Sequence, residues 1–261
     1  MSPEKLGQHF LADETWQEQI AEAIGIDGGV WVEIGAGHGE MTARLAQRAR
    51  KVFAIELDPR LAARLRKTMA RHANVEVIES DVLAVDFGKL AGGGRFSVYG
   101  SLPYYITSPI LHRLFEHAER IDAIHIVIQL EVAERIVAAP GRRDYGYLSV
   151  VSQWFGRPEI VFPIPPEAFR PPPKVDSALV SFHMPGERAK ILLDDETAFL
   201  EFVKECFAQK RKTLRNNLRA RLGTQAEDVL REAEISPGSR AEELTVGHLA
   251  GLFRVVRAKG I

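Results

Sequence analysis

The chain has 261 residues, of which 46% are hydrophobic and 26% are charged. These values are typical of a globular protein with one large domain, or with a large and a small one. The 34 basic residues nearly balance the 35 acidic ones, giving a formal net charge of -1, so any surface that binds nucleic acid must be local. Cys206 is the only cysteine, which excludes an internal disulfide and a thiolate metal cluster.

The N-terminal segment does not have the pattern of a targeting signal. It lacks a basic stretch followed by an apolar one, and no apolar run reaches the roughly 18 residues that span a bilayer. We therefore expect a cytoplasmic protein with no membrane attachment. His112 and His117, five residues apart, are expected on a solvated helix face, and the histidine spacing predicts no metal site.

The first half of the chain alternates strands with helices. Helices are predicted at about 40–49 and 59–71, and strands at 30–34, 52–56, 75–78, 96–99 and 125–130. This alternation predicts an α/β, Rossmann-like fold with a mainly parallel sheet covered on both faces. From Val151 to Phe182, two strand-like runs joined by a proline-rich segment predict an antiparallel edge.

The C-terminal part of the chain has a different, helical pattern. Residues 184–188 resemble a linker, and they are followed by predicted helices at 197–208, 210–222, 225–233 and 245–257. We therefore predict two domains. Residues 1–184 form the cofactor-binding α/β domain, and residues 185–261 form a small all-helical domain.

A glycine-rich turn follows the first predicted strand of the sheet and opens a helix. Gly35, Gly37 and Gly39 have the spacing G-x-G-x-G, whereas a nicotinamide dinucleotide site is expected to show G-x-G-x-x-G. Together with Glu33 just before it, this spacing favours S-adenosylmethionine. That cofactor has no pyrophosphate and needs a place for an amino-acid group and a sulfonium.

Two carboxylates follow the next two strands. Glu56 lies 21 residues after Gly35, where it can accept hydrogen bonds from both ribose hydroxyls of either cofactor. Asp81 can accept from the amino group of the cofactor's adenine, and Val82 can flank the ring. Their placement after consecutive strands of one sheet predicts a cofactor site.

The fourth strand ends in Ser101, Leu102, Pro103 and Tyr104. The form Asn/Asp/Ser-x-Pro-Tyr/Phe is carried by enzymes that methylate an exocyclic amine of a nucleobase. The hydroxyl of Ser101 and the carbonyl of Leu102 can accept the two amino hydrogens, directing the nitrogen lone pair toward a methyl donor. Pro103 stiffens the turn, Tyr104 stacks on the base, and Phe169 is the candidate for a second aromatic contact.

A basic segment in the predicted helical domain is the candidate RNA-binding surface. Residues 204–221 contain seven basic residues and one acid, Glu205, and so carry six net positive charges. The alternative is an ordinary solvated helix face, because the same segment has an apolar side. Arg142 and Arg143 are a candidate second contact. The basic residues are Lys204, Lys210, Arg211, Lys212, Arg215, Arg219 and Arg221.

These motifs together resemble the KsgA/RsmA-type small-subunit rRNA adenine N6,N6-dimethyltransferases. The matching segments run through almost the whole chain, at 7–11, 32–39, 55–58, 102–109, 145–150, 169–178 and 209–218. The resemblance implies a class I methyltransferase fold and S-adenosylmethionine as the cofactor. It also implies transfer of two methyl groups to each N6 of two adjacent adenines in the 3′-terminal hairpin loop of 16S rRNA, contributing to small-subunit biogenesis.

The resemblance also implies roles and partners for this chain. It places six residues around the cofactor, namely His9, Leu11, Gly35, Glu56, Asp81 and Ser101. The RNA partner is 16S rRNA in a small ribosomal subunit or its precursor, and we expect a monomer without an obligate protein partner.

The chain departs from the family pattern at two positions and lacks one extension. The family usually has Asn at the positions of His9 and Ser101, and serine keeps an acceptor but shortens its reach. The basic extension often found before the Gly7–Gln8 segment is missing. The departures at His9 and Ser101 leave open a non-catalytic ribosome-assembly or RNA-binding factor. An Erm-like 23S rRNA adenine dimethyltransferase is a second alternative, because it shares the cofactor and base-binding motifs, but the matches at 145–150 and 209–218 disfavour it.

Overall fold

The computed structural model describes residues 9–103 and 105–260. They group into two compact units, one within Met1–Ala133 and Glu159–Met184 and the other within Glu134–Pro158 and Pro185–Ile261. The chain passes from the first unit to the second after residue 184, and residues 134–158 also group with the second unit. Hydrogen bonds hold them there: the Trp154 indole donates to Glu196 (2.6 Å), and the Tyr145 hydroxyl donates to the Leu244 carbonyl (2.9 Å).

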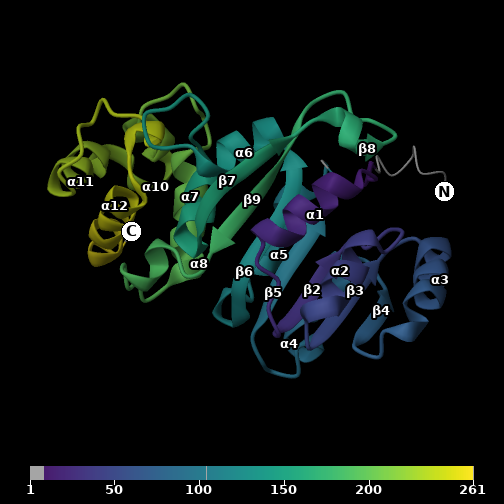
Figure 1. Ribbon diagram of the computed structural model, residues 1–261. Coiled ribbons are helices and arrows are strands. Elements are labelled where there is room, and N and C mark those ends of the chain that lie inside the picture. The colour runs from purple at the N-terminus through teal and green to yellow at the C-terminus, as the bar shows by residue number, and fades with distance from the viewer. Residues whose placement is uncertain (1–8, 104, 261) are drawn as a thin grey trace. The chain divides into compact units, whose positions relative to one another are not determined.

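A seven-stranded sheet has the order β4-β3-β2-β5-β6-β9-β7 (Figure 1). The first five strands in this order pair in parallel, and β9 pairs antiparallel with β6, so the predicted mixed sheet is confirmed. The strands are β2 (Val30–Ile34), β3 (Lys51–Glu56), β4 (Val75–Glu79), β5 (Phe96–Ser101), β6 (Ile121–Gln129), β7 (Arg157–Ile164) and β9 (Ser177–His183).

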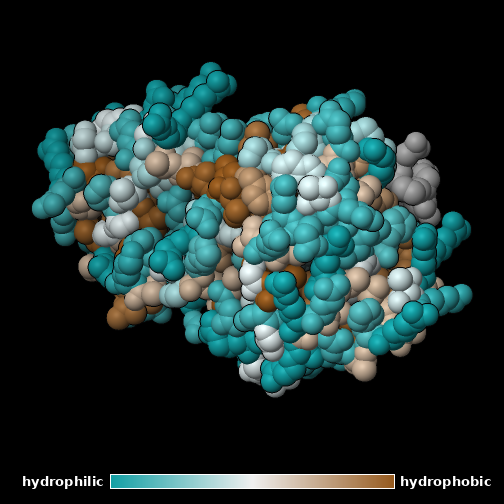
Figure 2. All heavy atoms as spheres, in the orientation of Figure 1, coloured by the Kyte–Doolittle hydropathy of each residue, from teal (hydrophilic) through white to brown (hydrophobic). Residues whose placement is uncertain are grey.

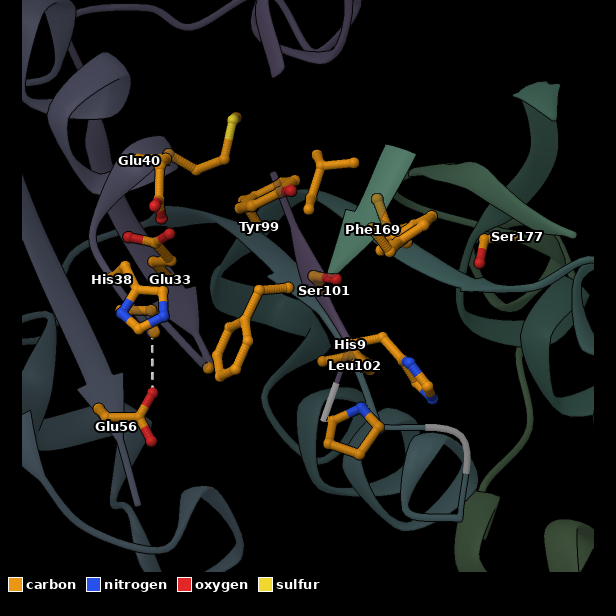
Figure 3. A pocket seen from close by; sticks show the side chains of 18 residues that line it. His9, Glu33, His38, Glu40, Glu56, Tyr99, Ser101, Leu102, Phe169 and Ser177 are labelled. Atoms are coloured by element: carbon orange, nitrogen blue, oxygen red, sulfur yellow. Dashed lines mark hydrogen bonds between the residues drawn. The ribbon is translucent and has the colours of Figure 1, made fainter. Parts of the chain in front are cut away.

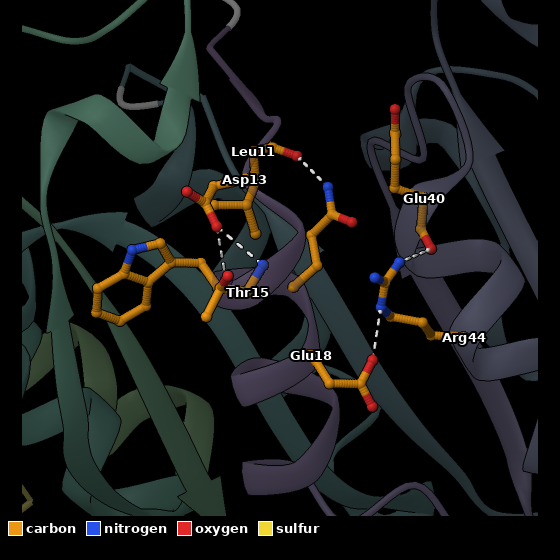
Figure 4. Close-up of polar contacts among 8 residues, drawn as sticks. Leu11, Asp13, Thr15, Glu18, Glu40 and Arg44 are labelled. Atoms are coloured by element: carbon orange, nitrogen blue, oxygen red, sulfur yellow. Dashed lines mark hydrogen bonds and ion pairs between the residues drawn. The ribbon is translucent and has the colours of Figure 1, made fainter.

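Helices α1 and α2 share a buried core with one face of the sheet. Ile20 of α1 and Leu45 of α2 belong to the same apolar cluster as Trp31 of β2 and Tyr99 of β5. Asp13 caps α1 by accepting from the Thr15 amide at 2.8 Å (Figure 4). The helices here are α1 (Glu14–Ala23), α2 (Glu40–Arg48), α3 (Pro59–Thr68), α4 (Phe87–Leu90), α5 (Thr107–Phe115) and α6 (Leu130–Val137).

The second unit contains helices that differ in two places from the sequence pattern. Residues 151–155, predicted as part of a strand-like run, belong to helix α7 (Tyr147–Phe155), which is so apolar that a periodic pattern is hidden. The predicted helix 210–222 is instead α9 (Leu214–Asn217) and α10 (Arg219–Leu222). Thr213 has extended backbone angles (φ −66°, ψ 158°), and the Leu214 amide donates to the Ser239 carbonyl.

The other helices of this unit lie close to their predicted positions. They are α8 (Glu196–Cys206), α11 (Ala226–Glu232) and α12 (Val246–Ala258). In the described part of the chain, no helix is long and apolar enough to cross a membrane. Hydrophilic side chains cover most of the face shown in Figure 2.

The paired histidines of the first unit are less exposed than their spacing suggests. His112 on α5 and His117 just after it are both half-buried, so the predicted solvated face is wrong. His117 packs edge-on against Phe87 at 5.6 Å, and burial lowers its pKa below the ordinary value. Among the described residues, no group of three or more His, Cys, Asp or Glu side chains is placed to hold a metal ion.

Candidate functional site

The carboxyl ends of β2, β3 and β5 meet at a pocket that we call the glycine-loop pocket (Figure 3). Parallel α/β sheets bind ligands at this edge, where the strand order reverses. The pocket contains nine residues that the sequence assigned to the site. Its lining is His9, Phe10, Leu11, Glu33, Gly35, Ala36, Gly37, His38, Glu40, Met41, Glu56, Tyr99, Ser101, Leu102, Pro103, Val127, Phe169 and Ser177.

The glycine loop has a backbone that other residues rarely adopt. Gly35, Gly37 and Gly39 have φ values of 72°, 56° and 94°. A Cβ atom on Gly37 would also lie 3.1 Å from the ring of Phe10. The spacing of the glycines therefore follows from the left-handed turn and from the close approach of Phe10.

Glu56 fixes this loop from the end of β3. One of its carboxylate oxygens accepts from the Gly37 amide at 2.8 Å (Figure 3), and the other accepts from the Asp58 amide at 2.9 Å. The residue is only 2% exposed. The sequence assigned Glu56 to a ribose, and the structure adds a second role in holding the loop. A carboxylate has about four lone-pair sites, so two hydroxyl groups can still be accepted.

Asp81 and Val82 lie in a second pocket, which we call the strand-end hollow. It shares Gly35, Glu56 and Pro103 with the glycine-loop pocket. One oxygen of Asp81 accepts from the Leu83 amide at 2.9 Å and so begins the turn Val82–Ala84. Apolar walls around one carboxylate suit a flat ring with an amino group. The lining is Ile34, Gly35, Ile55, Glu56, Leu57, Ser80, Asp81, Val82, Pro103, Tyr105, Ile106 and Ile110.

Ser101 is the last residue of β5, and the chain turns at the pocket wall directly after it. The Leu102 amide donates to the Val127 carbonyl at 3.0 Å, and the Pro103 carbonyl accepts from the Ile106 amide at 3.1 Å. These bonds hold the first three residues of the predicted base-binding motif. Tyr104 lies outside the described residues, so its stacking role stays a prediction.

A two-residue strand brings the N-terminal segment to the pocket. β1 (Phe10–Leu11) pairs antiparallel with β8 (Phe169–Arg170), with Leu11 opposite Phe169. Nδ1 of His9 donates to the Pro171 carbonyl at 2.8 Å. This two-stranded ladder explains how residues more than 150 positions apart line one pocket. Phe169 lies in the pocket wall, and its contact with a target base stays a prediction.

Tyr99 and Ser177 are among the polar side chains of the pocket to which sequence reasoning gave no role. Tyr99 precedes Ser101 by two residues on one strand, so the alternation of strand side chains was a signal for it. Ser177 comes from β9, whose pairing with β6 is long-range, and its local sequence gives no such signal.

Glu33 and His125 predict how stability depends on pH. Burial raises the pKa of Glu33 from 4.5 to about 8 and lowers that of His125 from 6.5 to about 4. From pH 6.5 to 8 the native state keeps the Glu33 proton that the unfolded chain has lost. The free energy of unfolding should therefore fall by up to about 1.4 kcal/mol per pH unit.

Between pH 6.5 and about 4.5, the two groups change the free energy of unfolding in opposite directions and nearly cancel. Below about pH 4.5, Glu33 is protonated in both states, and stability falls toward pH 4 because His125 gains a proton in the unfolded chain but not in the native state. Urea unfolding across pH 5–8 checks this, with Glu33→Gln as the comparison. The variant should lose the decline above pH 6.5, and equal slopes in both proteins would contradict the assignment.

The basic residues assigned to RNA are all exposed in the second unit. The Lys210 ammonium donates to the Arg143 carbonyl, which places these two candidates side by side. Arg221 pairs with Glu205 at 2.6 Å and Arg215 with Glu227 at 3.5 Å. These ion pairs offset part of the positive charge that the sequence suggested.

The strand order, the glycine loop and the two strand-end pockets define a class I methyltransferase. The model of the ribosomal RNA adenine dimethylase family matches residues 3–257. The chain belongs to this family, which confirms the resemblance of its motifs.

Similar proteins agree with this membership. The ribosomal RNA small subunit methyltransferase A of Acidobacterium capsulatum is 47% identical, with 97% of this chain and 90% of that protein covered. Its namesake in Koribacter versatilis is 40% identical, over 97% and 94% of the two chains.

Two solved structures are similar over nearly their whole length. A dimethyladenosine transferase from Plasmodium falciparum has a TM-score of 0.84 and 26% identity, covering 97% of this chain and 99% of that one. The 23S rRNA methyltransferase ErmE has a TM-score of 0.71 and 30% identity, covering 95% and 99%.

Proposed function

We propose that this protein transfers methyl groups from S-adenosylmethionine to N6 of two adjacent adenines in the 3′-terminal hairpin loop of 16S rRNA, contributing to small-subunit biogenesis. The observation that carries the proposal is that Ser101, Leu102 and Pro103 line the same pocket as the glycine loop and Glu56. The names of the curated relatives support the small subunit as the substrate.

Each of the two connected pockets suits a different part of the cofactor. The strand-end hollow suits the adenine, with Asp81 as the acceptor for its amino group and Val82 beside the ring. Glu56 lies where the pockets join and is assigned to the ribose. The glycine-loop pocket remains for the amino-acid end, next to Gly35, Gly37 and the His9–Leu11 segment.

The chemistry at the fourth strand needs acceptors more than a strong base. An adenine N6 amine is a poor nucleophile because its lone pair is delocalised into the ring. The Ser101 hydroxyl and the Leu102 carbonyl accept the two amino hydrogens and favour a pyramidal nitrogen. S-adenosylmethionine supplies the electrophilic methyl group. Because serine is shorter than asparagine, we expect a bridging water in the contact to Ser101.

A mass-spectrometric assay tests the proposal and its alternatives. Undermethylated small and large ribosomal subunits are incubated with labelled S-adenosylmethionine, and the digested RNA is searched for N6,N6-dimethyladenosine. We expect it at two adjacent adenines of 16S rRNA. Product only in 23S rRNA would favour the ErmE-like alternative, which the similarity to ErmE motivates. Binding to small subunits without any product would favour the non-catalytic assembly factor.

Tyr104 provides a further prediction about the base. We expect Tyr104→Ala to reduce methyl transfer by about tenfold to a hundredfold, because one base–aromatic stacking contact is worth about 1–3 kcal/mol. Cofactor affinity should change little. Tyr104→Phe keeps the ring and should retain most of the activity. Equal losses of transfer and of cofactor binding in Tyr104→Ala would refute the assignment.

We also propose that the exposed basic residues of the second unit contact rRNA phosphates. Lys210, Arg211 and Lys212 carry much of this charge. Neutralising all three should weaken binding to small subunits and reduce its dependence on salt. The proposed partner is 16S rRNA in the small subunit or its precursor. The protein is proposed to act as a cytoplasmic monomer without an obligate protein partner.

A further inference from the structure

The charged side chains that line the glycine-loop pocket are mostly acidic. Glu33, Glu40 and Glu56 contribute three carboxyl groups, and no Lys or Arg belongs to the described lining. S-adenosylmethionine carries a sulfonium, an ammonium and a carboxylate, and hence one net positive charge. The pocket therefore matches the sign of the cofactor's charge.

Glu33 and Glu56 are the two deeply buried acids of the pocket, and the pKa of Glu33 is shifted. Glu33 lies on β2, is 2% exposed, and accepts a hydrogen bond from the Thr42 hydroxyl at 2.5 Å. Burial raises its pKa to about 8, and the charges of Glu40 and Glu56 act in the same direction. In Figure 3, Glu33 and Glu40 lie next to each other at the glycine loop. At neutral pH the Glu33 carboxyl thus holds a proton until a cation reaches it.

Tyr99 lies beside Glu33 on the adjacent strand. The two residues are opposite each other in the pairing of β2 with β5, and both line the pocket. Tyr99 is 2% exposed, and its hydroxyl has no hydrogen-bond partner in the described part of the protein. Burial keeps its pKa far above the usual range, the charge of Glu33 acts in the same direction, and Arg44 acts in the opposite one. A buried hydroxyl without a protein partner is open to an acceptor from a ligand or an ordered water.

Among the described residues, four other titratable side chains line the pocket. Glu40 begins α2, Glu56 ends β3, His38 lies in the glycine loop, and His9 comes from the N-terminal segment. Glu33 and Tyr99 are the buried titratable pair at this end of the pocket.

We propose that Glu33 and Tyr99 bind the amino-acid end of the cofactor, and that this binding releases one proton from Glu33. The O–H bond of the Glu33 carboxyl breaks, the proton goes to the solvent buffer, and the carboxylate that remains pairs with the cofactor's ammonium. The Tyr99 hydroxyl donates to the cofactor's carboxylate. This inference rests on the proposed function, since it assumes S-adenosylmethionine as the ligand.

Isothermal titration calorimetry in buffers of different ionisation enthalpy measures the released proton. At pH 6.5 the cofactor's α-amino group is protonated, since such groups have a pKa of about 7.7–8.0. We expect close to one proton released per S-adenosylmethionine bound. 5′-Methylthioadenosine keeps the adenine and ribose but lacks the amino-acid end, so it should bind without release. The affinity for S-adenosylmethionine alone should rise by roughly tenfold to twentyfold from pH 6 to 7.5, because each released proton makes affinity change nearly tenfold per pH unit below the pKa.

Two variants separate the roles of the pair. Glu33→Gln should abolish proton release and lower the affinity for S-adenosylmethionine at least tenfold at pH 7.5. The affinity of this variant for 5′-methylthioadenosine should stay within about threefold of wild type, which also shows that the variant folds. Tyr99→Phe should lower the affinity for S-adenosylmethionine several-fold, while the proton is still released on binding.

The outcomes distinguish this inference from the proposed function. Binding of S-adenosylmethionine to the wild type without proton release would overturn the inference alone, as would equal release with 5′-methylthioadenosine or unchanged release in Glu33→Gln. If neither ligand binds the wild type, the proposed function itself fails.

Discussion

Replacing Glu56 with alanine should nearly eliminate cofactor binding, with an affinity loss of about a hundredfold or more. The substitution removes the proposed acceptor for the ribose hydroxyls and also the acceptor of the Gly37 and Asp58 amides. Hydrogen bonds to charged groups contribute about 1.5–3 kcal/mol each. We therefore also expect the free energy of unfolding to fall by about 3 kcal/mol. Calorimetric titration and urea unfolding measure the two effects.

Glu79 offers a matched control for Glu56. It is the neighbouring strand-end glutamate, opposite Glu56 in the pairing of β3 with β4, but its partner is the exposed Arg66. Exposed ion pairs contribute about 0–1 kcal/mol, so Glu79→Ala should leave both stability and cofactor binding nearly unchanged. Similar losses in the two variants would mean that Glu56 has no special role in the pocket.

A second large effect is expected at Gly186 in the helical unit. A Cβ atom there would lie 2.5 Å from both the Gln153 carbonyl oxygen and the Gly156 nitrogen, and 2.7 Å from the Gly156 oxygen. These are backbone atoms, which move only with the end of helix α7. We expect Gly186→Ala to lower the free energy of unfolding by about 3 kcal/mol, measured by chemical denaturation.

The same substitution at Gly251 should have the opposite sign. Gly251 lies inside helix α12, and a Cβ atom built on it meets nothing within 4 Å. Alanine should stabilise this helix by about 0.5–1 kcal/mol, because glycine is the poorer helix former. If Gly186→Ala were as well tolerated as Gly251→Ala, the tight packing of residues 153–156 against Gly186 would be refuted.

Local patterns were enough to predict the parallel part of the sheet and to point to several residues that line the glycine-loop pocket. Strands alternate with helices there, which predicts a parallel sheet. The carboxyl ends of neighbouring parallel strands lie at the same edge, so Gly35 after one strand and Glu56 at the end of the next are expected to lie close together. The Ser101–Pro103 turn was likewise predictable, because it directly follows β5.

Features that depend on distant pairing were not predictable from local patterns. The sequence around Phe10 gives no sign of its pairing with Arg170, and the grouping of residues 134–158 with the helical unit depends on contacts such as that of Tyr145 with Leu244. Helix α7 was partly mistaken for a strand because burial on nearly all sides removes the periodicity that identifies a helix.

The short ladder between β1 and β8 has a consequence for turnover. Leu11, assigned to the cofactor, and Phe169, assigned to the target base, are directly opposite each other in it. If exchange of a spent cofactor opens this ladder, it also disturbs the edge that carries Phe169. Four methyl transfers use four cofactor molecules, so we expect the grip on the adenine to loosen at each exchange between them. Successive methylations would then be separate encounters with the RNA, and monomethylated adenine should accumulate transiently.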